Sequence, residues 1–270
     1  MNKLQSQTIS LYRHTAVEIK LFWRSRQTIY LTFLIPLMGM ALLVYLNQEG
    51  MLEGFFATLV RGMGGGSVEG LETPAMTFWT IGLIVYCVID AAFENPAPKL
   101  VLQRNGGILK RLGGTPLRTW VFLAAKTLNA LLLIFVQVAL VLAMGLVSSD
   151  VSVAGNWWEL GVILLLGALT VAALGWSLSG LVEDAGGAVA AVHAIYIPLL
   201  LLCGAFVPLE AMPRVLQTVA RALPLTYFIK PLRSVMTEGT GLAANSGDLL
   251  VLTAWMIGAW IVAIRTFRWE

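Results

Sequence analysis

Six apolar stretches, each close to the thickness of a bilayer in length, divide the chain, and polar segments separate them. A transmembrane helix needs roughly 20 apolar residues to cross a hydrocarbon core about 30 Å thick. The pattern therefore predicts an all-α polytopic membrane protein, with a single domain over 1–270. The six predicted transmembrane helices are Gln27 to Leu46, Ala75 to Ala92, Thr119 to Val147, Glu159 to Val182, Ala188 to Val207 and Leu249 to Ile264.

The segment before the first stretch has a different period. Ile9, Tyr12, Ala16, Ile19 and Trp23 recur at intervals of three and four residues, which places them in one stripe of a helix. A basic amphipathic helix with an aromatic residue near its end lies in the headgroup plane rather than across the bilayer. We expect a cytoplasmic amphipathic helix over 1–26. The alternative is an ordinary helix packed on a soluble surface.

A second non-spanning region, 208–248, lies between the fifth and sixth stretches. Its apolar pieces, Met212 to Leu223 and Leu225 to Met236, are too short to cross, and prolines interrupt it. Short amphipathic pieces of this kind at the outer face predict re-entrant or interfacial helices rather than a soluble domain.

Composition supports a membrane protein. Hydrophobic residues make up 58% of the chain and charged residues 12%, against about 25% charged residues in soluble domains. The mean hydropathy is +0.80. Cys87 and Cys203 fall inside predicted spans, where free cysteine behaves as a small buried hydrophobe. The composition excludes a large second soluble domain, and the basic residues border the spans rather than cover one soluble face. We therefore expect membrane lipid, not nucleic acid, as a partner.

The basic residues also indicate orientation. Twelve of the 18 Lys and Arg residues lie before the first stretch, between the second and third, or after the last, and five lie in the other loops. Cytoplasmic loops carry the excess of Lys and Arg. This distribution predicts that both termini and the loop 95–118 are cytoplasmic, in a multi-pass protein.

Ionisable and aromatic residues in the spans are the candidate functional groups. Asp90 and Glu94 lie four residues apart on one helical face and are gating candidates; the alternative is that they pair with Lys99, Arg104 or Lys110. In the third span, we expect Lys126 to snorkel and Asn129 to make an interhelical hydrogen bond. Large flat side chains suit amphipathic cargo, although aromatic residues also serve as packing. The predicted substrate path consists of Phe78, Trp79, Tyr86, Tyr196 and Phe206.

The loop 95–118 is the most distinctive polar segment. Pro96 and Pro98 are expected to break the second span. Lys99 to Leu112 then predicts one short helix, closed by Gly113 and Gly114 and barred from extension by Pro116. Its basic side chains, Arg104, Lys110 and Arg111, are predicted to be exposed. A solvated loop bound to anionic lipid is the alternative.

This loop carries a family resemblance. Residues 107–116 read G-x-L-K-R-L-x-x-T-P and resemble the loop after the second span of ABC-2 type (type-2 ABC exporter) permeases, and residues 204–233 form a second anchor. The resemblance extends over nearly the whole chain. It implies that 1–26 is an elbow helix and that the loop contains a coupling helix docking in a groove of an ATPase. It also implies that the helices of 208–248 form an extracytoplasmic cap over the outer end of the translocation path; a purely structural lid is the competing interpretation. The ATPase-coupling residues it implies are Arg104, Gly107, Leu109, Lys110, Arg111, Leu112, Thr115 and Pro116.

The resemblance also implies the partners: two copies of an ABC ATP-binding subunit and a second permease chain, with a homodimer favoured over a heterodimer. ATP and Mg would be bound by the partner, and this chain would have no cofactor, no metal and no catalytic residues. Export at a prokaryotic plasma (inner) membrane is the implied role. The chain departs from the family just before the glycine, where relatives commonly have acidic residues and it has Gln103, Arg104 and Asn105.

Two other function classes predict different sequence features. A secondary transporter or channel working without an ATPase predicts internal repeats, broken helices and charges near the midplane. An intramembrane enzyme needs His, Asp or Cys clustered at one depth. The sequence shows neither pattern, and it contains no G-x-x-x-x-G-K-[ST] motif for binding ATP itself. Drugs, lipids, glycolipids and polyketides are all compatible cargoes.

Overall fold

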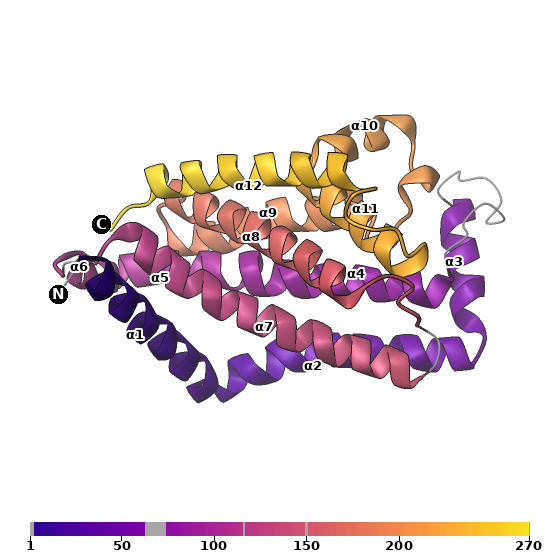
Figure 1. Cartoon of the computed structure of the whole chain (residues 1–270), viewed down its shortest axis with the longest axis horizontal. Coiled ribbons are helices and arrows are strands. Elements are labelled where there is room, and N and C mark those ends of the chain that lie inside the picture. Colours follow the sequence, from indigo (N-terminus) through magenta and orange to yellow (C-terminus); the bar gives the residue numbers. More distant parts are fainter. Residues whose placement is uncertain (1–2, 63–73, 116, 149–150, 270) are drawn as a thin grey trace.

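Long helices lying side by side dominate the structure (Figure 1). The computed structural model describes residues 3–62, 74–115, 117–148 and 151–269, and within them it contains helices and no strands. The all-α prediction is confirmed. The helices are α1 (Lys3–Arg24), α2 (Arg26–Gln48), α3 (Met51–Gly62), α4 (Ala75–Ile89), the π-helix η2 (Asp90–Glu94), α5 (Pro96–Asn105), α6 (Ile108–Gly113), α7 (Thr119–Val147), α8 (Trp157–Leu181), α9 (Ala185–Leu202), the 3-10 helix η3 (Leu209–Ala211), α10 (Arg214–Ala222), α11 (Pro224–Thr237) and α12 (Ser246–Thr266).

Five helical segments in the described part of the chain are long and apolar enough to cross a membrane. They match the first, second, third, fourth and sixth predicted spans. At the fifth, the apolar helix Gly186–Leu202 is shorter than the others. The chain therefore has the helices of a multi-pass membrane protein, and the count of six spans stays a prediction. The five segments are Thr28–Gln48, Ala75–Asn105, Thr119–Val147, Trp157–Leu181 and Ser246–Thr266.

The second span continues through the two prolines that were expected to break it. The backbone N–H of Asn95 donates to the carbonyl of Asp90 at 3.0 Å, one residue further back than in an α-helix. A π-turn of this kind absorbs the bend and the missing donor that a proline imposes. Pro96 then occupies the first turn of α5, where its absent N–H is not needed.

The predicted helix Lys99 to Leu112 is therefore wrong as a single unit. Its first half belongs to α5, which extends the second span to Asn105. Gly106 and Gly107 form the turn that follows, and Gly107 has a φ of +69°, a conformation that glycine adopts without steric penalty. Only α6 is a separate short helix at the end of the span.

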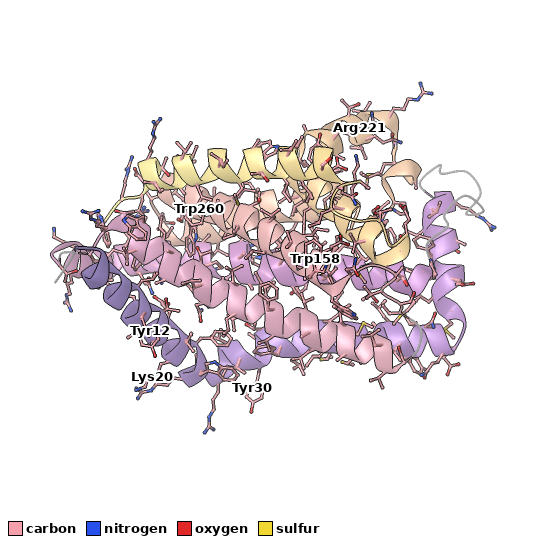
Figure 2. The ribbon with its side chains drawn as sticks, in the orientation of Figure 1. Tyr12, Lys20, Tyr30, Trp158, Arg221 and Trp260 are labelled. Atoms are coloured by element: carbon pink, nitrogen blue, oxygen red, sulfur yellow. The ribbon has the colours of Figure 1, made fainter. Side chains whose placement is uncertain are left out.

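The amino-terminal segment forms α1, which meets α2 at Ser25 and lies beside α7 (Figure 1). Members of its predicted apolar stripe are exposed: Tyr12 is 76% exposed and Trp23 54%. Figure 2 shows Tyr12 and Lys20 on its outer side. A helix in this segment is confirmed, and its position in the headgroup plane stays a prediction.

Glycines in α8 bring neighbouring helices close. A Cβ added at Gly167 would lie 2.3 Å from the ring of Phe228 in α11, and one at Gly180 would lie 2.7 Å from the carbonyl oxygen of Thr266 in α12. At Gly175 it would lie 3.1 Å from the carbonyl oxygen of Ala92. At Gly161 of the same helix, nothing lies within 4 Å of an added Cβ.

The region 208–248 contains both predicted short helices, as α10 and α11. α10 exposes Val215 and Val219 on one side. α11 buries most of its residues and packs against α4, α8 and α12. The first loop holds an element that the sequence analysis did not predict, α3, which buries Leu52, Phe56 and Val60.

Different elements lie at the two ends of the bundle. The start of α1, α6 and the end of α12 lie at one end, whereas α3 and α10 lie at the other (Figure 1). Arg221 of α10 projects at that second end (Figure 2). The cytoplasmic placement of the first end stays a prediction.

Candidate functional site

The short helix α6 is held firmly against the helix bundle. Leu109 is only 1% exposed, and Gly113 lies so close to Trp269 that an added Cβ would be 3.3 Å from its side chain. The hydroxyl of Thr115 donates to the carbonyl of Leu112 at 2.6 Å and closes the helix end. Gly107 starts it in the left-handed conformation. Four of the predicted coupling residues, Gly107, Leu109, Leu112 and Thr115, therefore shape and anchor this helix.

The other face of α6 is basic and accessible. Lys110 and Arg111 are both exposed and lie in the last turn of the helix, where positive charge is favoured by the helix dipole. Pro116, the last predicted coupling residue, lies outside the described residues. α6 therefore combines a buried side that fixes its position with two exposed cations. This arrangement suits a helix that docks on another protein.

Arg104 has a different environment from the one predicted. It was expected to be exposed, but it is partly buried, and its guanidinium donates to the carbonyls of Ser179 at 3.3 Å and Glu183 at 3.2 Å, and to that of Val182. The last carbonyls of a helix lack intrahelical partners and attract cations. Arg104 thus joins the end of α5 to the end of α8, and the exposure prediction is wrong.

We expect Arg104→Ala to destabilise the protein by about 1–3 kcal/mol, because several carbonyls lose a charged donor. Arg111→Ala is the control, since an exposed side chain in the same loop contributes within about 0.5 kcal/mol. Thermal unfolding of the two purified variants measures the difference. Equal melting temperatures would contradict the role of Arg104 as a link between α5 and α8.

Three of the predicted path aromatics form one cluster at the end of the bundle opposite α6. The ring of Trp79 lies 5.9 Å from those of Phe78 and Phe206, and Phe55 and Phe56 of α3 join it. Phe78 is fully buried, whereas Trp79 and Phe206 are half-buried. The buried indole N–H of Trp79 has no hydrogen-bond partner among the described residues. Phe78 is a packing residue, and the other two border accessible space.

The other predicted path and gating residues lie near the π-helix. Oδ1 of Asp90 accepts from the amide of Asn95 at 2.8 Å, and the carboxylate of Glu94 lies 3.5 Å from Nε2 of His193 in α9. The ring of His193 meets that of Tyr196 edge to face at 6.3 Å. The second span is thus joined to α9 by a carboxylate–histidine contact. The alternative for these carboxylates was pairing with Lys99, Arg104 or Lys110. Lys99 does interact electrostatically with Asp90, whereas Arg104 binds carbonyls at the end of α8.

Lys126 pairs with a residue that the sequence analysis did not single out. Its ammonium lies 2.8 Å from the carboxylate of Glu18 in α1, and the two side chains are 10% and 24% exposed. The two residues are 108 positions apart, so no local pattern relates them. The contact ties the amino-terminal helix to α7. The expected snorkelling of Lys126 is therefore replaced by an ion pair.

The two thiols and the possible metal ligands of the described residues form no metal-binding group. Cys87 and Cys203 are free and buried, as expected for cysteines that serve as small hydrophobes. Among the residues that the structure places, no three His, Cys, Asp or Glu side chains gather closely enough to hold a metal ion.

Comparison with protein families decides the class of the molecule. The model of the family described as ABC-2 type transporter matches residues 11–237, which include α6, the π-helix and the cap helices. The chain belongs to the ABC-2 type transporter family. The resemblance expected from the loop 95–118 is therefore confirmed, and the chain is a transporter permease.

Several proteins that are similar in sequence to this ABC-2 type chain are named as transport permeases. A protein of Bacillus subtilis named as a transport permease, YvfS, is 24% identical over 71% of this chain and 78% of its own length. YbhR of Escherichia coli, named as a multidrug ABC transporter permease, is 28% identical over 65% of this chain and 46% of its own. The ycf38 permease of Cyanophora paradoxa is 26% identical over 66% and 62%, respectively.

An ABC-2 type permease works with an ATP-binding partner, because the family provides the membrane part of an ABC transporter. In this ABC-2 type chain, α6 combines a buried anchor, Leu109, with exposed cations just beyond the end of the second span. It is the best candidate contact for such a partner.

Proposed function

We propose that the chain is the membrane subunit of an ATP-driven exporter and that a separate ATP-binding subunit moves it through α6. The observation that carries the proposal is the structure of α6: Leu109 anchors it, and Lys110 and Arg111 point away from the bundle. Two ATP-binding subunits would act on two permease chains, most simply two copies of this one. ATP and Mg would be bound by those subunits.

The helix that precedes α6 in the chain, α5, offers a direct mechanical route from the proposed contact into the membrane. Only the turn at Gly106 and Gly107 separates α6 from α5, and α5 continues the second span as one apolar helix, Ala75–Asn105. Displacement of α6 would therefore tilt this span. The π-helix lies within it, so the contact between Glu94 and His193 would strain or break as α9 is left behind. Asp90 and Glu94 are gating candidates on this ground.

Six membrane crossings fit this proposal, with α9 as the fifth. Its apolar part of about 17 residues would rise about 26 Å, and a bilayer adapts to a span a few Å shorter than its core. Both termini and the loop 95–118 would then lie in the cytoplasm, as the excess of Lys and Arg indicates. The plasma membrane of a prokaryote is the proposed location.

The proposed path runs along the second span and α9. Tyr86 and Tyr196 would line it near the carboxylates, and Trp79 and Phe206 near the outer end, where both are half-buried. Flat amphipathic surfaces suit amphipathic cargo, in keeping with the name of YbhR as a multidrug permease. The cap helices α10 and α11 would close the outer end.

The contact between Glu94 and His193 favours one other function, transport driven by an ion gradient, because ionisable residues at membrane depth often carry protons. Inside-out vesicles containing this chain and its ATP-binding partner distinguish the two. With an amphipathic fluorescent dye as the probe, we expect uptake on adding ATP and none with a proton gradient alone. Uptake by the chain without nucleotide or partner would contradict the exporter proposal.

A further inference from the structure

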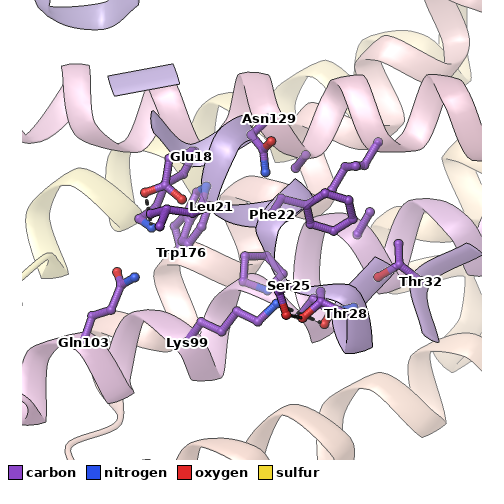
Figure 3. A pocket seen from close by; sticks show the side chains of 16 residues that line it. Glu18, Leu21, Phe22, Ser25, Thr28, Thr32, Lys99, Gln103, Asn129 and Trp176 are labelled. Carbon is purple, nitrogen blue, oxygen red and sulfur yellow. Dashed lines mark hydrogen bonds and ion pairs between the residues drawn. The ribbon is translucent and has the colours of Figure 1, made fainter. Parts of the chain in front are cut away.

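A cavity of about 300 Å³ opens between α1 and the helices of the membrane domain. Residues of α1, α2, η2, α5, α7 and α8 line it (Figure 3). Its volume is at the lower limit for small-molecule sites, about 300–1,000 Å³. Neither the predicted path residues nor α6 contributes to it, although it shares the π-helix and α5 with the proposed mechanical route.

Positive charge exceeds negative charge in this cavity. Lys99 and Lys126 line it together with one carboxylate, that of Glu18. Lys126 is paired with Glu18 at 2.8 Å. Lys99 lies 3.5 Å from the amide oxygen of Asn95 and interacts electrostatically with Asp90, which does not itself line the cavity. Figure 3 shows Lys99 extending along the cavity toward Ser25 and Thr28. A ligand phosphate inside the cavity would meet two lysines and one carboxylate.

The cavity also offers a hydrogen-bond acceptor. Oδ1 of Asn129 is buried, and no described residue donates to it. The sequence predicts an interhelical hydrogen bond from Asn129, but its side-chain oxygen accepts none from the described residues. A buried acceptor without a donor is unfavourable, because it loses its hydrogen bonds to water without replacing them. A ligand that brings a hydroxyl or an ammonium group would satisfy it.

The remaining walls are apolar, and the cavity lies at the junction of the amphipathic helix with the spans. Phe22, Leu133 and Trp176 line it, and Leu21 at its edge is 56% exposed. Apolar walls next to a pair of lysines at a helix–span junction match the boundary between headgroups and acyl chains. Free inorganic anions would leave those walls in contact with water.

We propose that this cavity binds the headgroup of a phospholipid that carries both a phosphate and a hydrogen-bond donor, with phosphatidylglycerol as the best fit. The phosphate lies between Lys99 and Lys126, and a glycerol hydroxyl donates to Oδ1 of Asn129. Phosphatidylcholine supplies the phosphate but neither a net charge nor a donor. The lipid thereby bridges α1 to α5 and α7.

Native mass spectrometry of the purified full-length protein, titrated with phosphatidylglycerol in neutral detergent, measures the affinity. We expect phosphatidylglycerol to bind about tenfold more tightly than phosphatidylcholine, and Lys99→Gln to remove about tenfold in affinity, as for one charge-assisted contact. Lys99 is exposed at the mouth of the cavity, so this variant folds. Asn129→Leu removes the acceptor for the glycerol hydroxyl and leaves both lysines in place. We expect it to abolish the preference for phosphatidylglycerol over phosphatidylcholine.

Lys20→Gln is the matched control. Lys20 is an exposed lysine of α1 that does not line the cavity, so its loss leaves the affinity unchanged if the site is specific. Equal weakening by Lys20→Gln and Lys99→Gln would show a general basic surface and overturn the proposal. So would displacement of the lipid by inorganic phosphate at equal concentration. The titration needs no ATPase, so its outcome is independent of the proposed coupling function.

Discussion

Replacing Lys110 and Arg111 together with glutamate is expected to separate the permease from its ATP-binding subunit. Both side chains are exposed on a helix that is otherwise anchored, so the change reverses the charge at the proposed contact without altering the packing beneath it. Like charges placed opposite each other at an interface weaken it by several kcal/mol. We therefore expect a loss of affinity of about a hundredfold or more, measured by co-purification and by ATPase activity of the complex.

The control for this reversal is Arg214→Glu with Arg221→Glu. These exposed arginines of α10 lie at the opposite end of the bundle (Figure 1), so the same change in net charge is made far from α6. We expect normal amounts of the ATP-binding subunit with this variant. Both variants should insert and melt as the parent does, because exposed substitutions change stability by about 0.5 kcal/mol or less. Normal ATPase activity in the Lys110 and Arg111 variant would contradict docking at α6.

Gly167→Ala is expected to destabilise the protein at the contact between α8 and α11. The added Cβ would lie 2.3 Å from the ring of Phe228, which is fully buried in α11. Overpacking at such a site destabilises a protein by about 1–3 kcal/mol, which exceeds the roughly 1 kcal/mol that alanine gains over glycine in a helix. We expect a lower melting temperature and weaker attachment of the cap helices to α8.

Gly161→Ala separates these two effects. Gly161 lies in the same helix, and nothing lies within 4 Å of its added Cβ, so only the gain in helix propensity remains. We expect Gly161→Ala to melt at the same temperature as the parent or higher. Similar destabilisation by both substitutions would show that the contact between α8 and α11 is not the cause.

Most helices could be predicted from the sequence because their signal is local. The long apolar stretches correspond to α2, α4, α7, α8 and α12, and the period of the cap residues corresponds to α10 and α11. The break expected at Pro96 and Pro98 failed because a π-turn at Asp90–Glu94 supplies an alternative backbone arrangement. α3 was missed because glycine and glutamate residues in its loop obscured a short apolar stripe.

The site was less predictable because its contacts join distant parts of the chain. The pattern around α6 could be recognised, yet the partner of Arg104 is the end of α8, 75 to 79 positions away. The pairs Lys126 with Glu18 and Glu94 with His193 also connect different helices. A sequence shows that such a charge needs a partner, but only the packing of the helices determines which one it finds.

Cross-linking from α6 tests the central claim most directly. Cys87 and Cys203 are buried, so a cysteine placed at position 110 by Lys110→Cys is the accessible thiol for a short cross-linker in the assembled complex. Arg214→Cys, on exposed α10, is the matched control. We predict a cross-link to the ATP-binding subunit from position 110 and none from position 214. An intact complex that forms the cross-link from position 214, or none from position 110, would contradict the account.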